Sequence, residues 1–479
     1  MAKGSAGSLG VKSALAVALI AVIVLAATNV WNPFPNLWNW VNRSQPLSEP
    51  DVVWQQRVGG TPRSVTIVGN TVVAEYRTRV EARSLATGVQ IWDRKADWAA
   101  VAGGDRDAVV AVGKLLVKGY ELIDPESGAV RRRDTRAIGV WTYRNALLDV
   151  RCGDPRECTL TAWDPRGSAP LWTAFLPGVQ AGLFADNPEL LGTRRLETDR
   201  VNGAAGGPEM MPPLLGFPVD GRVHIVDTAT GRVVHEAQPG EQDRMVVVGG
   251  RVLRIEARPA DGTCYFTVVA RDAATGQEVW RRDGINPRTA DGPGCVQRQD
   301  PQGGQNVVVG VAADAREVVL DAYDGRALWV GGKGERLIAV DDRYALSRSA
   351  DRKSVRGWEL AIDRARWTRE VNPDGGGALT RYAAVIVDRK PDRIIALDPR
   401  SGRELINLRS SAVVFAVGSA GLIIGDGRDL GYARFGGVPS GGPAPGNTGS
   451  GDPPGSVDGV DCGGPKQEQC PPAGGGKDG

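Results

Sequence analysis

Histidine and methionine are scarce in this chain of 479 residues, which contains two His and four Met. Two imidazoles leave little room for a histidine-based metal site or catalytic triad. The chain also lacks an excess of charge of either sign, because 58 Lys and Arg balance 56 Asp and Glu to a net charge of +2. Proteins that bind nucleic acid usually carry a basic excess. The composition therefore argues against nucleic acid as a partner.

The motifs of common nucleotide-binding and hydrolytic sites are also missing. The sequence has no Walker loop, no Gly-x-Ser-x-Gly and no His-Glu-x-x-His. No cysteine belongs to a Cys-x-x-Cys pair, so neither a redox site nor a zinc site is indicated. The two histidines, His224 and His235, fall in one predicted hairpin. We expect them to pack there and not to bind a metal.

The six cysteines favour structural disulfides in an oxidising compartment. Their even number fits such a framework. Proximity along the chain suggests three pairs, although six cysteines allow fifteen connectivities. The candidate pairs are Cys152–Cys158, Cys264–Cys295 and Cys462–Cys470.

An apolar run near the N-terminus predicts a membrane anchor. Residues 13–28 (SALAVALIAVIVLAAT) carry no charge and follow Lys3 and Lys12, which favour a cytoplasmic N-terminus. We therefore predict a short cytoplasmic segment (1–12), a transmembrane signal anchor (13–31) and a proline-containing tether (32–50). A cleaved signal peptide is the alternative. In both cases the rest of the chain lies outside the cytoplasm, and the anchor makes it a single-pass protein of the cell membrane.

The opposite end of the chain has a different composition. Residues 436–479 are about half Gly and Pro, so they offer no face with which to build a core. We predict a disordered tail, in which Cys462 and Cys470 could close a small loop.

One sequence motif, which we call the phrase, recurs between residues 51 and 435. It consists of an apolar strand, an Asp, three residues, a Gly, and a second strand with a bulky residue about four positions after the Gly. Copies are spaced by about forty residues, with longer insertions in places. They occupy residues 80–92, 120–132, 160–172, 223–235, 268–280, 318–329 and 394–406, with a weaker copy at 355–367 that lacks the Gly.

The phrase has a simple physical reading. The Asp accepts backbone hydrogen bonds in a turn, and the Gly provides a positive φ. The bulky residue is most often Trp, whose flat side chain can dock between neighbouring repeats. The turn residues are Asp124 and Gly128, Asp227 and Gly231, Asp272 and Gly276, Asp321 and Gly325, and Asp398 and Gly402. The docking residues are Trp54, Trp92, Trp172, Trp280, Trp329 and Trp367.

Four short strands per repeat of about forty residues are typical of a β-propeller, with an open solenoid as the alternative. Residues 51–58 resemble the Trp strand of a repeat, and residues 412–435 supply three strands without one, so the two segments are expected to pair and close the ring. Eight phrases plus this closing unit would give nine blades. Because the copy at 355–367 lacks the Gly turn, we predict an all-β propeller of about eight four-stranded blades, with seven or nine possible.

The repeat Ala-x-Asp-x-x-Thr-Gly-x-x-x-Trp resembles that of the PQQ-like, or quinoprotein alcohol-dehydrogenase-like, β-propellers. The resemblance covers about residues 51–435 and rests on the recurrence of the phrase. This family contains dehydrogenases that use pyrroloquinoline quinone (PQQ). It also contains non-enzymatic binding scaffolds such as the outer-membrane assembly lipoprotein BamB. The anchor and the Gly/Pro tail make the chain similar to membrane-anchored, actinobacterial-type members of the family.

The resemblance to the enzymes stops at their chemistry. In the dehydrogenases a disulfide between adjacent cysteines stacks on PQQ, and Glu, Asn and Asp hold Ca²⁺. Here no two cysteines are adjacent, and no local motif matches the calcium ligands. We therefore expect no catalytic, cofactor-binding or metal-binding residues, and keep PQQ and calcium as the alternative.

The sequence thus predicts a non-catalytic binding or assembly scaffold in the cell envelope. Its partner would be an envelope protein or a cell-wall component. A PQQ- and calcium-dependent dehydrogenase and an envelope ligand-binding sensor module are the alternatives. Met210 and Met211, in the long insertion at 186–213, are candidate partner contacts, because Met side chains adapt to irregular surfaces. The alternative is an ordinary loop packed on the ring.

Overall fold

A computed structural model describes residues 45–104, 106–154, 157–177, 190–196, 198–219, 222–238, 243–291 and 294–436. The predicted cytoplasmic segment, the predicted anchor and most of the predicted tether lie outside these residues, as does the predicted tail beyond residue 436. Within the described ranges, no helix has both the length and the apolar character needed to cross a membrane.

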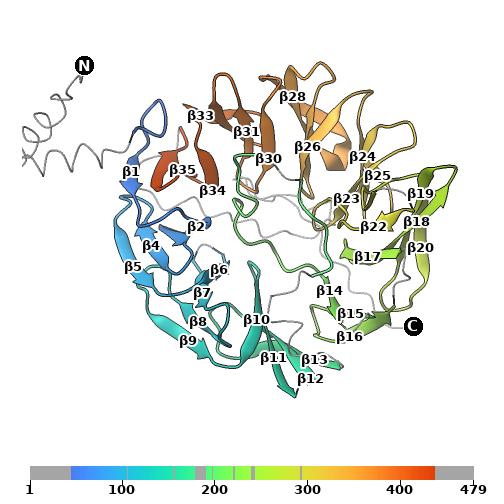
Figure 1. Ribbon diagram of the computed structural model, residues 1–479, viewed down its shortest axis with the longest axis horizontal. Helices are drawn as coiled ribbons and strands as arrows, with labels where there is room; N and C mark the ends of the chain where they lie inside the picture. The colour runs from blue at the N-terminus through green and yellow to red at the C-terminus, as the bar shows by residue number, and fades with distance from the viewer. Residues whose placement is uncertain are drawn as a thin grey trace, which may run out of the picture. The chain divides into compact units, whose positions relative to one another are not determined.

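The described strands form nine radial sheets around a ring, which we number as blades 1 to 9 (Figure 1). Within each blade, consecutive strands pair antiparallel. Blade 1 contains β2 (Ser64–Val68), β3 (Thr71–Glu75), β4 (Val80–Ser84) and β5 (Gln90–Arg94). Blade 2 contains β6 (Trp98–Ala102), β7 (Val109–Gly113), β8 (Tyr120–Ile123) and β9 (Val130–Asp134). Blade 3 contains β10 (Ala137–Thr142), β11 (Leu147–Asp154), β12 (Glu157–Trp163) and β13 (Pro170–Pro177).

Two of the next three blades have three strands. Blade 4 contains β14 (Leu214–Val219), β15 (Arg222–Asp227) and β16 (Val233–Ala237). Blade 5 contains β17 (Asp243–Val248), β18 (Arg251–Ala260), β19 (Thr263–Arg271) and β20 (Glu278–Asp283). A small hairpin follows, with β21 (Ala290–Asp291) and β22 (Val296–Gln297). Blade 6 contains β23 (Val307–Val311), β24 (Glu317–Asp321) and β25 (Ala327–Val330).

The last blades bring the two ends of the ring together. Blade 7 contains β26 (Arg336–Val340), β27 (Tyr344–Arg348), β28 (Ser354–Glu359), the 3₁₀ helix η2 (Leu360–Ile362) and β29 (Arg364–Glu370). Blade 8 contains β30 (Gly376–Leu379), β31 (Ala384–Asp388), β32 (Arg393–Leu397) and β33 (Glu404–Arg409). Blade 9 contains β34 (Val413–Val417), β35 (Gly421–Asp426), β36 (Asp429–Arg434) and, from the start of the ring, β1 (Trp54–Arg57).

Ring closure follows the sequence prediction. β1 pairs antiparallel with β36, so that Trp54 lies opposite Tyr432. Each neighbouring pair of described blades shares one apolar cluster, nine in all, and the cluster between blades 9 and 1 includes Trp54. The core therefore consists of apolar interfaces between neighbouring sheets around the ring. The pairing of β1 with β36 in blade 9 completes the ring.

The blade count of eight was wrong, because the ring has nine blades. The weak copy at 355–367 forms the last two strands of blade 7, where Asp363 adopts a positive φ of 43° in place of Gly. Short polar residues reach this conformation more easily than other non-glycine residues. The four-stranded expectation also fails for blades 4 and 6, each of which lacks its own first strand.

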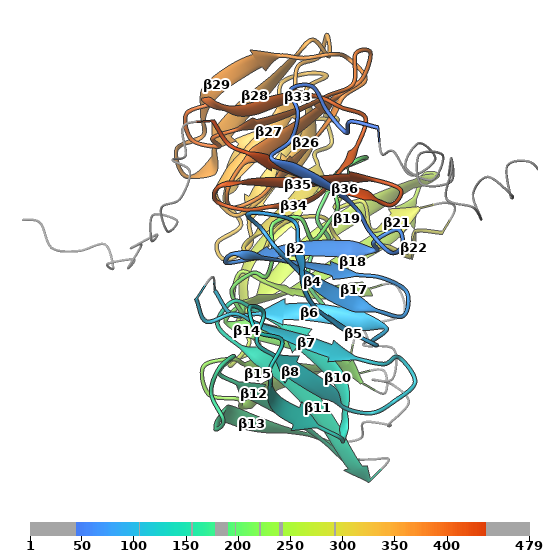
Figure 2. The ribbon, with the colours of Figure 1, turned by 90° about the vertical axis from the view of Figure 1, so that its left-hand side faces the viewer.

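The connections of the blades lie on two faces of the ring. In a four-stranded antiparallel sheet, the first and third hairpins lie at one end, and the second hairpin lies at the other end with the link to the next blade. We call these the turn face, which carries the Asp–Gly turns, and the link face. Figure 2 shows the ring from the side, with the hairpins β11–β12 and β18–β19 projecting toward the right, on the link face.

The repeated Trp residues dock on the turn of the following blade. The indole Nε1 of Trp92 donates to the carbonyl oxygen of Pro125, 2.9 Å away, which follows Asp124 in the next turn. A Cβ added to Gly128 of that turn would lie 2.7 Å from Cγ of Trp92, so the ring covers the glycine. Equivalent contacts join Trp54 to Leu85 and Gly88, Trp172 to Thr228 and Gly231, Trp280 to Ala322 and Gly325, and Trp367 to Pro399 and Gly402.

The turns themselves form as the phrase predicts. Oδ1 of Asp124 accepts hydrogen bonds from the backbone N–H groups of Glu126 and Ser127 at 3.1 and 3.0 Å, and Gly128 N donates to the carbonyl oxygen of Asp124 at 2.9 Å. Burial alone would raise the pKa of Asp124, but hydrogen bonds from Arg131 and Ser127 outweigh it and lower that pKa to about 2. The carboxylate is therefore ionised, and a strong acceptor, at neutral pH.

Four of the nine docking positions do not place an indole over a Gly turn, and the one in blade 8 is occupied by Ile406. Arg132 stands where a Trp is expected in blade 2, and its guanidinium lies 4.1 Å from the ring centroid of Trp163 in blade 3, so the aromatic ring comes from the receiving blade. His235 occupies the position in blade 4. Trp329 lies in the apolar cluster between blades 6 and 7, where it packs edge to face with Trp358 of blade 7, with ring centroids 6.2 Å apart.

The glycine under the docked ring can be tested with a matched pair. Gly128 and Gly276 both have positive φ, 71° and 68°, but a Cβ at Gly276 would meet only Cε1 of His235 at 3.7 Å. A positive φ costs a non-glycine residue about 1–2 kcal/mol, and overpacking costs about 1–3 kcal/mol more. We expect Gly276→Ala to lower the free energy of unfolding by about 1 kcal/mol and Gly128→Ala by about 3 kcal/mol, measured by urea denaturation. Equal losses would mean that Trp92 does not require the glycine.

Candidate functional site

A segment of the chain lies inside the ring. Residues 190–213, of which residue 197 is outside the described residues, lead from blade 3 to β14, and we call them the crossing segment. In Figure 1 it is the green trace that crosses the centre of the ring, reaches the inner strands near β30 and returns to β14. The insertion that the sequence singled out is therefore part of the centre of the propeller, and not a loop on its rim.

The first part of the crossing segment fills the inner edges of the three-stranded blades. Leu191 N donates to the carbonyl oxygen of Gly216 in β14 at 3.1 Å, and Val247 N in β17 donates to the carbonyl oxygen of Leu191 at 2.7 Å. Leu191 thus lies where blade 4 lacks a first strand. Arg194 then forms a parallel bridge with Gln302, beside blade 6.

Arg195 lies among acidic side chains in the central channel, which is the space enclosed by the inner strands of the ring. It forms an ion pair with Glu209, near the other end of the crossing segment. Burial lowers the pKa of Arg195, and the carboxylates of Asp341 and Asp342 in blade 7 act against this. Burial likewise raises the pKa of Asp341 and of Asp342, and the charge of Arg195 partly offsets it. Arg195 therefore lies near the first turn of blade 7, on the turn face.

Arg200 holds the crossing segment on the link face. Its guanidinium donates to the carbonyl oxygens of Asp388 at 3.0 Å and Ser410 at 2.5 Å, and to Oδ1 of Asp392 at 3.0 Å. Arg200 also has a positive φ of 67°, a strained conformation for a non-glycine residue. Since Asp388 and Asp392 flank the second hairpin of blade 8, this arginine marks the point where the crossing segment reverses direction.

The returning part runs beside blade 9. Val201 forms a parallel bridge with Val414, whose N–H donates to the carbonyl oxygen of Arg200 at 2.7 Å. Val417 N, at the other end of β34, donates to the carbonyl oxygen of Ala205 at 2.7 Å. Residues 200–202 therefore pair with the start of β34, and the turn at residues 203–206 places Ala205 beside the other end of β34, toward the turn face.

The two predicted partner contacts, Met210 and Met211, lie at the end of the crossing segment on the turn face. Met210 is 49% exposed, and its carbonyl oxygen accepts from Nε2 of Gln305 at 2.6 Å. Met211 packs against the apolar cluster between blades 3 and 4, and its N–H donates to Oδ1 of Asn145 at 2.8 Å. Of the two side chains, Met210 is the one that a partner could reach.

Two cavities lie between the crossing segment and the inner strands. The larger, of about 520 Å³, is lined by charged and polar residues that include Arg288, Arg389 and Asp199. Its charges are paired, because Arg389 contacts Asp199 at 2.6 Å and Arg288 contacts Glu317. The smaller, of about 380 Å³, has Asn202 and Thr380 among largely apolar neighbours. The crossing segment thus leaves two small cavities inside the ring, one mainly polar and one with many apolar lining residues.

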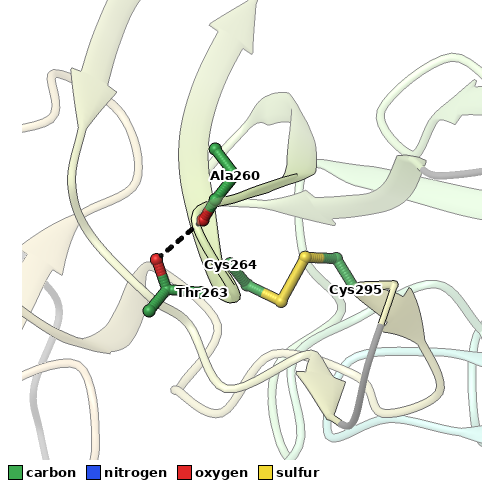
Figure 3. Close-up of a disulfide and its surroundings, with 4 residues drawn as sticks. All are labelled: Ala260, Thr263, Cys264 and Cys295. Carbon is green, nitrogen blue, oxygen red and sulfur yellow. Dashed lines mark hydrogen bonds between the residues drawn. A yellow bond between two sulfur atoms is a disulfide. The ribbon is translucent and has the colours of Figure 1, made fainter.

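Two of the three predicted disulfides form within the described residues. Cys152 pairs with Cys158 across the hairpin β11–β12, and Cys264 pairs with Cys295 beside β22 (Figure 3). Thr263, next to Cys264, donates from Oγ1 to the carbonyl oxygen of Ala260 at 3.1 Å. The third candidate pair, Cys462 and Cys470, lies outside the described residues. Neither described disulfide joins adjacent cysteines, unlike the disulfide that stacks on PQQ in the dehydrogenases.

The two histidines occupy packing positions. His224 is buried in β15, with Nδ1 3.4 Å from Oε1 of Glu236, and the ring of His235 lies over Gly276. In the part of the chain that the structure describes, His, Cys, Asp and Glu form no group of three or more arranged to hold a metal ion.

Sequence reasoning missed the role of the crossing segment. Its length was visible in the longer interval between the third and fourth phrases, but its partners Asp388 and Ser410 lie about two hundred residues farther along the chain. The contact between Arg132 and Trp163 could be suspected only because Arg132 stands where most repeats have Trp. The sequence also contains three consecutive apolar residues, Leu115–Val117, between two lysines, and their exposure was not predicted.

The anchor formed by Arg200 can be tested directly. Arg200→Ala removes hydrogen bonds from a charged donor, each worth about 1.5–3 kcal/mol, so amide exchange in residues 198–206 should become at least about tenfold faster by mass spectrometry. Arg389→Ala is the control, because its pair with Asp199 is exposed and such pairs contribute little. Unchanged exchange in Arg200→Ala would show that the crossing segment does not depend on this residue.

Comparison with known proteins points to one family. The sequence profile described as outer membrane protein assembly factor BamB matches residues 159–407, just over half of the chain. The chain is 26% identical over 326 residues to the outer membrane protein assembly factor BamB of Burkholderia pseudomallei, which covers 58% of this chain and 81% of that protein. It is 29% identical over 125 residues to a 1-butanol dehydrogenase (cytochrome c) of Thauera butanivorans, covering 26% of this chain and 17% of the enzyme.

Among solved structures, BamB from Moraxella catarrhalis aligns with 74% of this chain and 95% of its own, at 14% identity and a TM-score of 0.32. The profile match and the recurring Trp-docking phrase rest on the same strands, since residues 159–407 run from β12 to β33. The chain belongs to the family of PQQ-like β-propellers described as outer membrane protein assembly factor BamB.

Proposed function

We propose that this protein is a non-catalytic binding or assembly scaffold in the cell envelope. The observation that carries the proposal is the similarity to a protein named as an assembly factor over 81% of that protein's length. By contrast, the similarity to an alcohol dehydrogenase covers 17% of the enzyme.

The scaffold is tethered to the cell membrane in this proposal. The apolar run at residues 13–28, preceded by lysines, would span the bilayer with the N-terminus in the cytoplasm. The propeller would then lie outside the cytoplasm, where both disulfides are stable.

The partner would bind the turn face near the end of the crossing segment. Met210 and Tyr323 are exposed there, by 49% and 58%. Gln305 donates from Nε2 to the carbonyl oxygen of Met210, and its own carbonyl oxygen accepts at 2.8 Å from N of Gly249, which lies beside Tyr323. Arg251 lies 4.0 Å from the ring centroid of Tyr323. An exposed Met and an exposed Tyr flanked by Arg have the composition of a protein-binding surface.

Site-specific crosslinking tests the partner surface. A photoreactive phenylalanine analogue replaces Met210 in the full chain, expressed in its native host, and Glu126 receives the same analogue as the control. Glu126 is exposed in the third turn of blade 2, on the same face but away from Met210. We expect a discrete crosslinked protein at position 210 that is absent at position 126. Crosslinks to cell-wall polymer, or identical products at both positions, would overturn the proposed protein partner.

The absence of a quinone cofactor is a separate prediction. Titration of residues 45–436 with PQQ and Ca²⁺ should leave tryptophan fluorescence unchanged beyond the quenching of a propeller that does not bind PQQ. The physical reason is that the crossing segment occupies the channel and is anchored at both faces. Saturable, calcium-dependent quenching at micromolar PQQ would contradict this prediction and favour the dehydrogenase alternative.

A further inference from the structure

An exposed apolar loop projects from blade 2. Leu115, Leu116 and Val117 are 60%, 98% and 59% exposed, and they stand between Lys114 and Lys118, which are also exposed. Single apolar residues on a surface are ordinary, but three in sequence at a loop tip leave a continuous apolar surface in water. Such a surface is typical of a site that contacts a membrane or another protein.

The loop is held so that its tip points away from the blade. Leu115 N donates to Oδ2 of Asp97 at 3.2 Å, and Gly119 N donates to the carbonyl oxygen of Ala137 at 2.7 Å. Asp97 precedes blade 2 and Ala137 begins blade 3, so both ends of the loop are tied to links between blades. Val117 N closes a turn on the carbonyl oxygen of Lys114 at 3.3 Å. The apolar tip is therefore presented by a fixed base on the link face.

The described chain also begins at the link face. Leu47 accepts at its carbonyl oxygen from Oγ of Ser410 at 2.6 Å, and Glu49 bridges Arg409. Ser410 and Arg409 lie at the link between blades 8 and 9. Figure 2 shows the first described residues on the same right-hand side as the hairpins β11–β12 and β18–β19. A segment that starts at residue 45 and leads back to the apolar run at 13–28 would bring this face toward the bilayer.

Two exposed aromatic residues lie toward the same face. Tyr265, 56% exposed, is next to Cys264 at the tip of the hairpin β18–β19. Phe175, 54% exposed, is near the end of β13 and lies opposite Thr159, beside the Cys152–Cys158 hairpin. Aromatic side chains are favoured at the boundary between lipid headgroups and acyl chains.

We propose that the link face rests on the membrane and that Leu115, Leu116 and Val117 insert into the boundary between headgroups and acyl chains. The apolar side chains would leave water, while Lys114 and Lys118 would contact anionic headgroups. The tip is too short to span a membrane, so it positions the propeller and does not anchor it. This role goes beyond the proposed scaffold and depends on the proposed N-terminal tether. It leaves the turn face, with Met210, directed away from the bilayer.

A probe at the tip tests the inference in the full chain. In a background with Cys462→Ser and Cys470→Ser, Leu116→Cys carries an environment-sensitive fluorophore, and the protein is reconstituted in phosphatidylcholine liposomes with phosphatidylglycerol. Glu126→Cys is the matched control, since it is exposed in the same blade on the turn face. We expect blue-shifted emission and several-fold stronger quenching by lipid-bound spin labels at position 116 than at position 126.

The charged flank gives a second measurement. Lys114→Glu with Lys118→Glu should reduce lipid quenching at position 116 in liposomes that contain phosphatidylglycerol and change it less in phosphatidylcholine alone. Equal, water-like emission at positions 116 and 126 would overturn the proposal. Shielding of position 116 in native membranes but not in protein-free liposomes would also overturn it, in favour of a protein groove. Neither result bears on crosslinking at Met210, so the two proposals can fail separately.

Discussion

The fold depends on one contact, in which the indole of one blade lies over a glycine in the turn of the next blade. The glycine serves two purposes there, because it adopts the positive φ that the turn requires and leaves room for the ring. Gly128 under Trp92 shows both. The indole N–H then donates to a backbone carbonyl of the same turn, so a buried polar atom is satisfied while the blades pack. This contact recurs at five of the nine junctions between blades, where it sets the spacing of the sheets.

The exceptions to this contact explain what the sequence could and could not predict. Turns such as Asp124–Gly128 could be recognised because every interaction within them is local and recurs at a fixed interval. The blade count failed where Asp363 takes the conformation of the glycine, since one left-handed residue is not visible without coordinates. The exchange at Arg132 and Trp163 was hidden because two blades share the contact.

The centre of the ring could not be predicted for a different reason. The crossing segment has no repeat, and its partners are distant in sequence, as the contact between Arg200 and Ser410 shows. Such contacts carry no local pattern. Their effect is nevertheless large, because one irregular segment fills the inner edge of blade 4, pairs with β34 in blade 9 and contacts blades that share no interface. The ring is thereby braced across its diameter as well as around its circumference.

The pairing of β1 with β36 has a consequence for the order of synthesis. Trp54 belongs to the first strand made, yet its partner Tyr432 is among the last residues of the ring. During translation, β1 has no sheet to join until almost the whole propeller has been made, and the growing arc exposes an open edge at each end. Residues 429–434 (β36) therefore close the ring. A chain that ends before them leaves β1 without its partner strand, and the ring stays open.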